Sequence, residues 1–123
     1  MTIKSKQIKG LGRGHEIGYP TINLAVPSDV PFDEGIYATW VLIDGVTYKG
    51  ALHYGSIPTF DLREKTMEVH LIGLDDETIP ETLDMDIEID IVERLRSVKK
   101  FEDIEELADQ IASDIRKVNA ILK

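Results

Sequence analysis

IYATWVLIDGVTYKGALHY, residues 36–54, is the stretch that decides the fold. Residues 36–43 are rich in aromatic and β-branched side chains, which is typical of a strand that is covered on both faces. Asp44-Gly45 follows, and a second strand-like run starts at Val46. Asp-Gly between two such runs is the turn that a tight hairpin requires, so the sequence predicts an antiparallel pair of strands here.

Two more strands are predicted after this hairpin. Residues 67–74, MEVHLIGL, form the first, in which Glu68 and His70 point away from the apolar residues that alternate with them. Residues 83–92, LDMDIEIDIV, alternate strictly between apolar and acidic side chains. That alternation predicts a strand with one buried face and one solvated face.

The periodicity changes near residue 104, where apolar residues begin to recur every three or four positions. They are Ile104, Leu107, Ile111, Ile115, Val118 and Leu122. This spacing predicts an amphipathic helix, and Asp103 followed by Glu106 fits a capping box at its start. Several short strands followed by one helix indicate a mainly β domain, either a barrel or a sandwich, with the helix packed against it.

Composition bounds the class of protein. The chain has 123 residues, which fits a single domain spanning 1–123, and its hydrophobic content of 42% with 30% charged residues is typical of globular proteins. It contains no cysteine, which excludes disulfides and thiolate metal sites, and its three histidines lack zinc-ligand spacing. With no signal peptide and no apolar run long enough to span a membrane, we expect a cytoplasmic protein that does not bind membranes.

The charge distribution argues against one further class of partner. A net charge of −9 disfavours nucleic-acid binding, which needs a basic face. The first acidic residue is Glu16, and all of the preceding charged residues are basic: Lys4, Lys6, Lys9 and Arg13. This basic end could receive an anion, although a solvated, lysine-rich terminus explains the same charges.

GRGHEIGYPTINL, residues 12–24, carries the first candidate site. Its glycines let backbone N–H groups approach a phosphate closely. The stretch is not a Walker A loop, because no Gly-Lys-Ser/Thr follows, and it is not a dinucleotide fingerprint, because no helix follows. A plain hairpin loop would explain the same glycines.

Two polar residues follow that loop. Pro20 cannot donate to a strand ladder, so it belongs at a strand start or edge. Beyond it, Thr21 and Asn23 share the face opposite the apolar residues. A hydroxyl and an amide oxygen side by side suit a magnesium ion that is already carried by ATP, and they equally suit a solvated strand face.

Glu68 is the second candidate. A carboxylate between core residues on a well-formed strand is held rigidly, so it could act as a general base toward a hydroxyl group. An ion pair with a lysine on a neighbouring strand is the alternative.

Four segments of the chain together resemble the riboflavin kinase (flavokinase) family, of the ATP-dependent bacterial and eukaryotic type. The segments are GRGHEIGYPTINL (12–24), GSIPTF (55–60), EVHL (68–71) and RLRSVKKFEDIEELADQIASD (94–114). Their order and spacing hold over nearly the whole chain. The resemblance implies a mainly β fold: a small six-stranded antiparallel Greek-key barrel with a C-terminal amphipathic α-helix.

The resemblance also implies an activity and the residues that perform it. The reaction would transfer the γ-phosphoryl group of MgATP to the ribityl 5′-hydroxyl of riboflavin, giving FMN and ADP. Glu68 would be the catalytic base, Thr21 and Asn23 would bind Mg²⁺ or a similar divalent ion, and Arg96 would contribute to the flavin side. The ATP-binding residues would be Gly12, Arg13, Gly14, Gly18, Pro20 and Thr21. We expect a monomer.

Two departures from the family pattern keep other functions open. Many members have Asn-Ile-Gly where this chain has His53-Tyr54-Gly55, and the loop GLDDETIPET (73–82) lacks the usual Tyr-Gly. One alternative is therefore a non-catalytic flavin- or nucleotide-binding module on the same barrel. Another is an acidic interaction domain that uses the polar face of residues 84–90. Because this sequence starts at the kinase segment, we do not expect the FAD synthesis that bacterial members perform with an additional adenylyltransferase domain.

Overall fold

The computed structural model describes residues 1–8, 19–56, 65–75, 77–80, 82, 85–99 and 101–123. It contains a sheet of six strands: β1 (Thr2–Ser5), β2 (Thr21–Leu24), β3 (Gly35–Ile43), β4 (Val46–Ser56), β5 (Lys65–Leu71) and β6 (Ile87–Arg96). One helix, α1 (Ile104–Ile121), follows. The predicted class, mainly β with a C-terminal helix, is confirmed.

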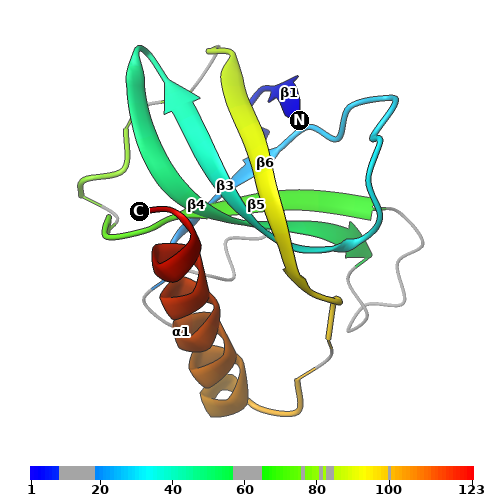
Figure 1. Cartoon of the computed structure of the whole chain (residues 1–123), viewed down its shortest axis with the longest axis vertical. Coiled ribbons are helices and arrows are strands. Elements are labelled where there is room, and N and C mark those ends of the chain that lie inside the picture. Colours follow the sequence, from blue (N-terminus) through cyan, green and yellow to red (C-terminus); the bar gives the residue numbers. More distant parts are fainter. Residues whose placement is uncertain (9–18, 57–64, 76, 81, 83–84, 100) are drawn as a thin grey trace.

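The sheet is antiparallel and curls into a half-barrel, with α1 lying against its outer face (Figure 1). The strand order is β1-β6-β3-β4-β5-β2, so β3, β4 and β5 form a meander and β6, the next strand along the chain, returns to lie beside β3. This is the order of a Greek key. The two edge strands approach each other through an isolated bridge between Gln7 and Leu24.

The β3–β4 hairpin confirms the prediction made from Asp44-Gly45. Asp44 has a φ of 48° and Gly45 a φ of 80°. Two successive residues with positive φ give a turn whose twist matches that of the flanking strands.

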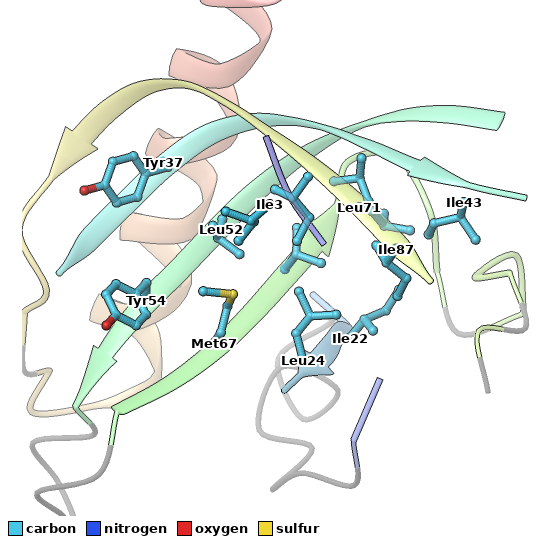
Figure 2. Packing of buried hydrophobic residues seen from close by; sticks show 13 residues of the cluster. Ile3, Ile22, Leu24, Tyr37, Ile43, Leu52, Tyr54, Met67, Leu71 and Ile87 are labelled. Carbon is cyan, nitrogen blue, oxygen red and sulfur yellow. The ribbon is translucent and has the colours of Figure 1, made fainter. Parts of the chain in front are cut away.

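The core lies on the concave side of the sheet, where alternate side chains of every strand meet (Figure 2). β2 contributes Ile22 and Leu24, as predicted, and Leu24 is fully buried. Because side chains alternate along a strand, Thr21 and Asn23 lie on the outer face. The same rule places Glu68 and His70 on the outer face of β5, since Met67, Val69 and Leu71 belong to the core.

β6 differs from its predicted bounds. It begins at Ile87 and continues to Arg96, whereas the alternating pattern predicted a strand over residues 83–92. Acidic side chains of β6 and of the residue before it pair with the N-terminal segment, which contains β1; no strand was predicted there. Nζ of Lys4 lies 3.6 Å from Oε1 of Glu88, and Nζ of Lys6 lies 3.8 Å from Oδ1 of Asp86. Part of the acidic face is therefore neutralised by the basic N-terminal segment.

α1 starts at the predicted cap, because the Asp103 carboxylate accepts a hydrogen bond from the Glu106 backbone N–H at 2.8 Å. The helix covers the outer face of the sheet mainly over β3, β4 and β6. Val118 and Leu122 are buried there against Ala38, with Trp40 and Ala51 at the edge of the contact. The part of the outer face formed by β5 and β2 lies beside this contact, and it carries the candidate site.

Candidate functional site

Strand register brings the predicted site residues together on the outer face. β2 and β5 pair so that Thr21 is opposite His70 and Asn23 is opposite Glu68. β4 pairs with the other edge of β5, and this places His53 opposite Glu68. We call these five residues, Thr21, Asn23, His53, Glu68 and His70, the outer-face cluster. Directly opposite residues of an antiparallel pair have β carbons about 5 Å apart, so the polar groups of the cluster are neighbours.

The Thr21 hydroxyl is the unusual member of the cluster. Its oxygen is buried, and it has no hydrogen-bond partner among the residues that the structure describes. Leaving a buried hydroxyl unpaired costs roughly 1–3 kcal/mol, so such groups are rare unless a ligand completes them. The neutral oxygens of Thr21 and Asn23 fit a divalent cation that takes its remaining ligands from phosphate and water.

His70 secures the chain just before Thr21. Its Nδ1 lies 2.8 Å from the Pro20 carbonyl oxygen, and because a carbonyl can only accept, Nδ1 carries the proton. The Tyr19 ring meets the imidazole edge-on, with centroids 5.6 Å apart. Burial lowers the pKa of His70 below its ordinary value of 6.5, although the bond to Pro20 acts in the opposite direction. His70 is thus a neutral, buried donor that ties β5 to the entry of β2.

Glu68 is half-buried and is flanked by Asn23 on one side and His53 on the other. It projects from the middle of β5, where Met67 and Val69 are anchored in the core. Packing on both sides along the strand fixes the backbone beneath the carboxylate. This is the rigid placement that a general base requires.

Arg96 lies in the same row of the sheet but has another partner. It is opposite Ile36, which is opposite His53, so three strand spacings separate it from Glu68, about 14 Å along the sheet. Its Nε and Nη2 donate to the two carboxylate oxygens of Asp114 on α1 at 2.9 and 2.8 Å, and Nη1 donates to the Ser97 carbonyl at 3.0 Å. All three guanidinium nitrogens are therefore engaged within the chain, and Arg96 joins the end of β6 to the helix.

Asp114 is a residue that the sequence patterns did not single out. It is 3% exposed and also accepts a hydrogen bond from the Gln110 side chain at 3.0 Å. A signal was present, because an aspartate three residues after Ile111 and four before Val118 falls on the apolar face of the helix. Its position there indicates a buried partner.

Some predicted residues cannot be placed. Gly12, Arg13, Gly14 and Gly18 lie outside the described residues, as do residues 57–60 of the GSIPTF segment. Within the described part of the chain, no group of three or more His, Cys, Asp or Glu side chains could hold a metal ion. No helix of that part combines the length and apolar character needed to cross a bilayer.

Comparison with known proteins identifies the family. The flavokinase family model, described as riboflavin kinase, matches residues 1–122. The chain is 34% identical over 117 residues to the bifunctional riboflavin kinase/FMN adenylyltransferase of Bacillus subtilis, a match that covers 91% of this chain and 35% of that protein. It is 30% identical over 126 residues to the riboflavin kinase of Homo sapiens, covering 98% of this chain and 79% of the human protein.

The fold has a counterpart among solved structures as well. The crystal structure of a protein titled macrolide-efflux protein, from Streptococcus pneumoniae, superposes with a TM-score of 0.82 at 25% identity. The match covers 96% of this chain and 38% of that one. The chain thus spans little more than a third of the longer bacterial proteins, but most of the human enzyme. Since the family model accounts for all but the last residue, the chain belongs to the riboflavin kinase family.

Proposed function

We propose that this protein is an ATP-dependent riboflavin kinase, which converts riboflavin and ATP to FMN and ADP. Family membership supports the reaction class. The observation that carries the proposal is the pairing of Asn23 with Glu68 across β2 and β5, beside a buried Thr21 hydroxyl that has no hydrogen-bond partner in the described part of the chain. A candidate base and two neutral oxygen ligands thereby lie within one small patch of the sheet.

Thr21 and Asn23 are the residues that would hold the magnesium ion of MgATP. The ion would neutralise charge on the transferring phosphoryl group. The segment that leads into β2 would enclose the phosphates of ATP with Gly12, Arg13, Gly14 and Gly18, followed by Pro20 and Thr21. The hydrogen bond from His70 to the Pro20 carbonyl supports this role, because it fixes the backbone on which the Thr21 hydroxyl is presented.

Glu68 would act as the general base. It would accept the proton of the ribityl 5′-hydroxyl as that oxygen bonds to the γ-phosphorus, while the bond from phosphorus to the β,γ-bridging oxygen breaks and ADP leaves. A positioned base contributes about 10²- to 10⁴-fold to such a step, and alignment of the two substrates contributes most of the rest.

Arg96 would contribute to the flavin side by fixing the segment between β6 and α1. Its ion pair with Asp114 and its position 5.9 Å from the Phe101 ring centroid support this role. All three guanidinium nitrogens of Arg96 already donate hydrogen bonds within the chain. Arg96 would therefore shape the flavin side through the segment that it holds in place, and its guanidinium would not bind the flavin directly.

The test is incubation of the purified protein with riboflavin, ATP and Mg²⁺, followed by chromatographic separation of the flavins. FMN that forms only when both ATP and the metal are present supports the proposal. If riboflavin fluorescence is quenched but no FMN forms, the protein is a non-catalytic flavin-binding module and not a kinase. If neither MgATP nor riboflavin changes the melting temperature, both the kinase and the binding module are excluded.

A further inference from the structure

His53 occupies a defined position between the helix-covered part of the outer face and the candidate site. It is half-buried and lies on β4. Ala51, two residues earlier on the same face, packs at the edge of the α1 contact. On the side of β3 the residue directly opposite His53 is Ile36, and on the side of β5 it is Glu68.

The described residues around His53 differ in what they can offer an imidazole. Ile36 and Ala51 have no side-chain atom that can form a hydrogen bond. Two polar residues of β5 lie diagonally from His53, and each is hydrogen-bonded elsewhere: the Thr66 hydroxyl donates to the Gly55 carbonyl at 3.3 Å, and Nδ1 of His70 donates to the Pro20 carbonyl. Among these described neighbours, Glu68 is the directly opposite polar side chain and the one that carries a carboxylate.

Partial burial would strengthen a polar contact between His53 and Glu68. Both His53 and Glu68 are half-buried, and a polar contact that is partly removed from water is stronger than the same contact on an exposed strand. Directly opposite residues have β carbons roughly 5 Å apart, which an imidazole and a carboxylate can span with one hydrogen bond.

We propose that His53 is a positioning residue for the reaction, which orients the Glu68 carboxylate for proton abstraction. An imidazole N–H donates to one carboxylate oxygen, and the other oxygen is left directed at the acceptor hydroxyl. Asn23, on the opposite side of Glu68, limits rotation of the carboxylate away from this orientation. The inference rests on the proposed function, because it concerns the base of that reaction.

Two substitutions at position 53 separate positioning from packing. His53→Leu removes the donor and should lower kcat by on the order of tenfold to a hundredfold, with little change in KM for ATP or riboflavin. His53→Asn retains an N–H donor and should recover most of the loss. Thr47→Leu is the matched control, because it places a leucine on the same face of β4 but outside the outer-face cluster, and it should behave as wild type. Equal kcat for His53→Leu and wild type would overturn the proposal.

A double-mutant cycle tests whether His53 acts through Glu68. In a Glu68→Gln background, His53→Leu should have no further effect on the single-turnover rate, because the group that it orients is gone. Effects that multiply would overturn the proposal. If the wild-type protein makes no FMN at all, the proposed function fails, which is a different outcome from a kinase that is insensitive to His53.

A spectroscopic measurement covers the case in which His53→Leu does not fold. Glu68→Gln should shift the imidazole NMR signals of His53, assigned by their loss in His53→Asn, whereas Thr47→Leu should leave them in place. Signals of His53 that do not respond to Glu68→Gln would overturn the proposal.

Discussion

Arg96 holds Asp114 through two parallel hydrogen bonds, from Nε at 2.9 Å and from Nη2 at 2.8 Å. The side chains are 17% and 5% exposed, so the pair is shielded from water. It joins the end of β6 to the middle of α1. The helix is therefore fixed to the sheet by a directional contact as well as by the apolar residues around Val118.

Asp114→Asn should lower the free energy of unfolding by about 3 kcal/mol, because it leaves the Arg96 charge buried without its counter-ion. Urea denaturation measures the loss. Glu88→Gln is the control, since its partner Lys4 is 70% exposed and such surface pairs contribute less than about 1 kcal/mol. Equal losses for the two variants would contradict the view that burial makes the Arg96–Asp114 pair important.

Thr21→Val tests whether the Thr21 hydroxyl is a metal ligand or has only a structural role. Because the buried hydroxyl has no hydrogen-bond partner among the described residues, its removal should leave the melting temperature unchanged or raise it. If the oxygen binds the metal, the Mg²⁺ concentration for half-maximal activity should rise by on the order of tenfold. Binding of Mn²⁺ in the presence of ADP, followed by electron paramagnetic resonance, measures the same loss without turnover.

Thr39→Val is the matched control for Thr21→Val. Its hydroxyl is also buried, but it donates to the Gly50 carbonyl at 3.2 Å. Removing it should cost about 1 kcal/mol of stability and leave the metal dependence unaltered. A destabilised Thr21→Val with normal Mn²⁺ binding would show that Thr21 is structural.

Glu68→Gln tests the base. The amide has nearly the same shape as the carboxylate but cannot accept the proton, so kcat should fall by about 10²- to 10⁴-fold while ATP still binds. FMN formation and the binding of a fluorescent ATP analogue measure the two quantities separately. A variant that keeps near-full activity would remove Glu68 from the mechanism.

The alternation of side chains was predictable from the sequence, because each residue's face depends only on its neighbours along the chain. That is why the outward placement of Thr21, Asn23 and Glu68 was predicted correctly. Their proximity to one another was not derivable in this way, since it depends on the register between β2 and β5. That register is set by how two distant segments pack in the core, and only the family resemblance indicated that these residues act together.

Two further features could not be predicted from local sequence patterns, because they depend on packing between distant segments. β1 has only four residues, TIKS, with Ile3 as its single large apolar side chain, so no pattern marks it as a strand. It is stabilised by pairing with the acidic face of β6. Arg96 was singled out for the flavin side, and that role stays a prediction; its partner Asp114 was not predicted, because it lies on a helix whose docking position no local pattern specifies.

His70 should make stability depend on pH in a defined direction. Burial lowers its pKa below 6.5 in the folded protein, whereas the unfolded chain takes up the proton near that value. Below about pH 6.5 the unfolded state therefore binds more protons, so His70 lowers the free energy of unfolding as the pH falls, until the folded form is protonated too. Above this range the neutral imidazole contributes its bond to Pro20 in full.

The comparison of wild type with His70→Gln isolates this contribution, because His15 and His53 are present in both proteins. Urea denaturation in metal-free buffer, at steps between about pH 7.5 and about pH 5.5, gives the two stability curves. The difference in free energy of unfolding between wild type and His70→Gln should shrink steadily as the pH falls. If the two curves instead run parallel, protonation of His70 is not linked to unfolding, and the imidazole must remain accessible to protons in the folded state.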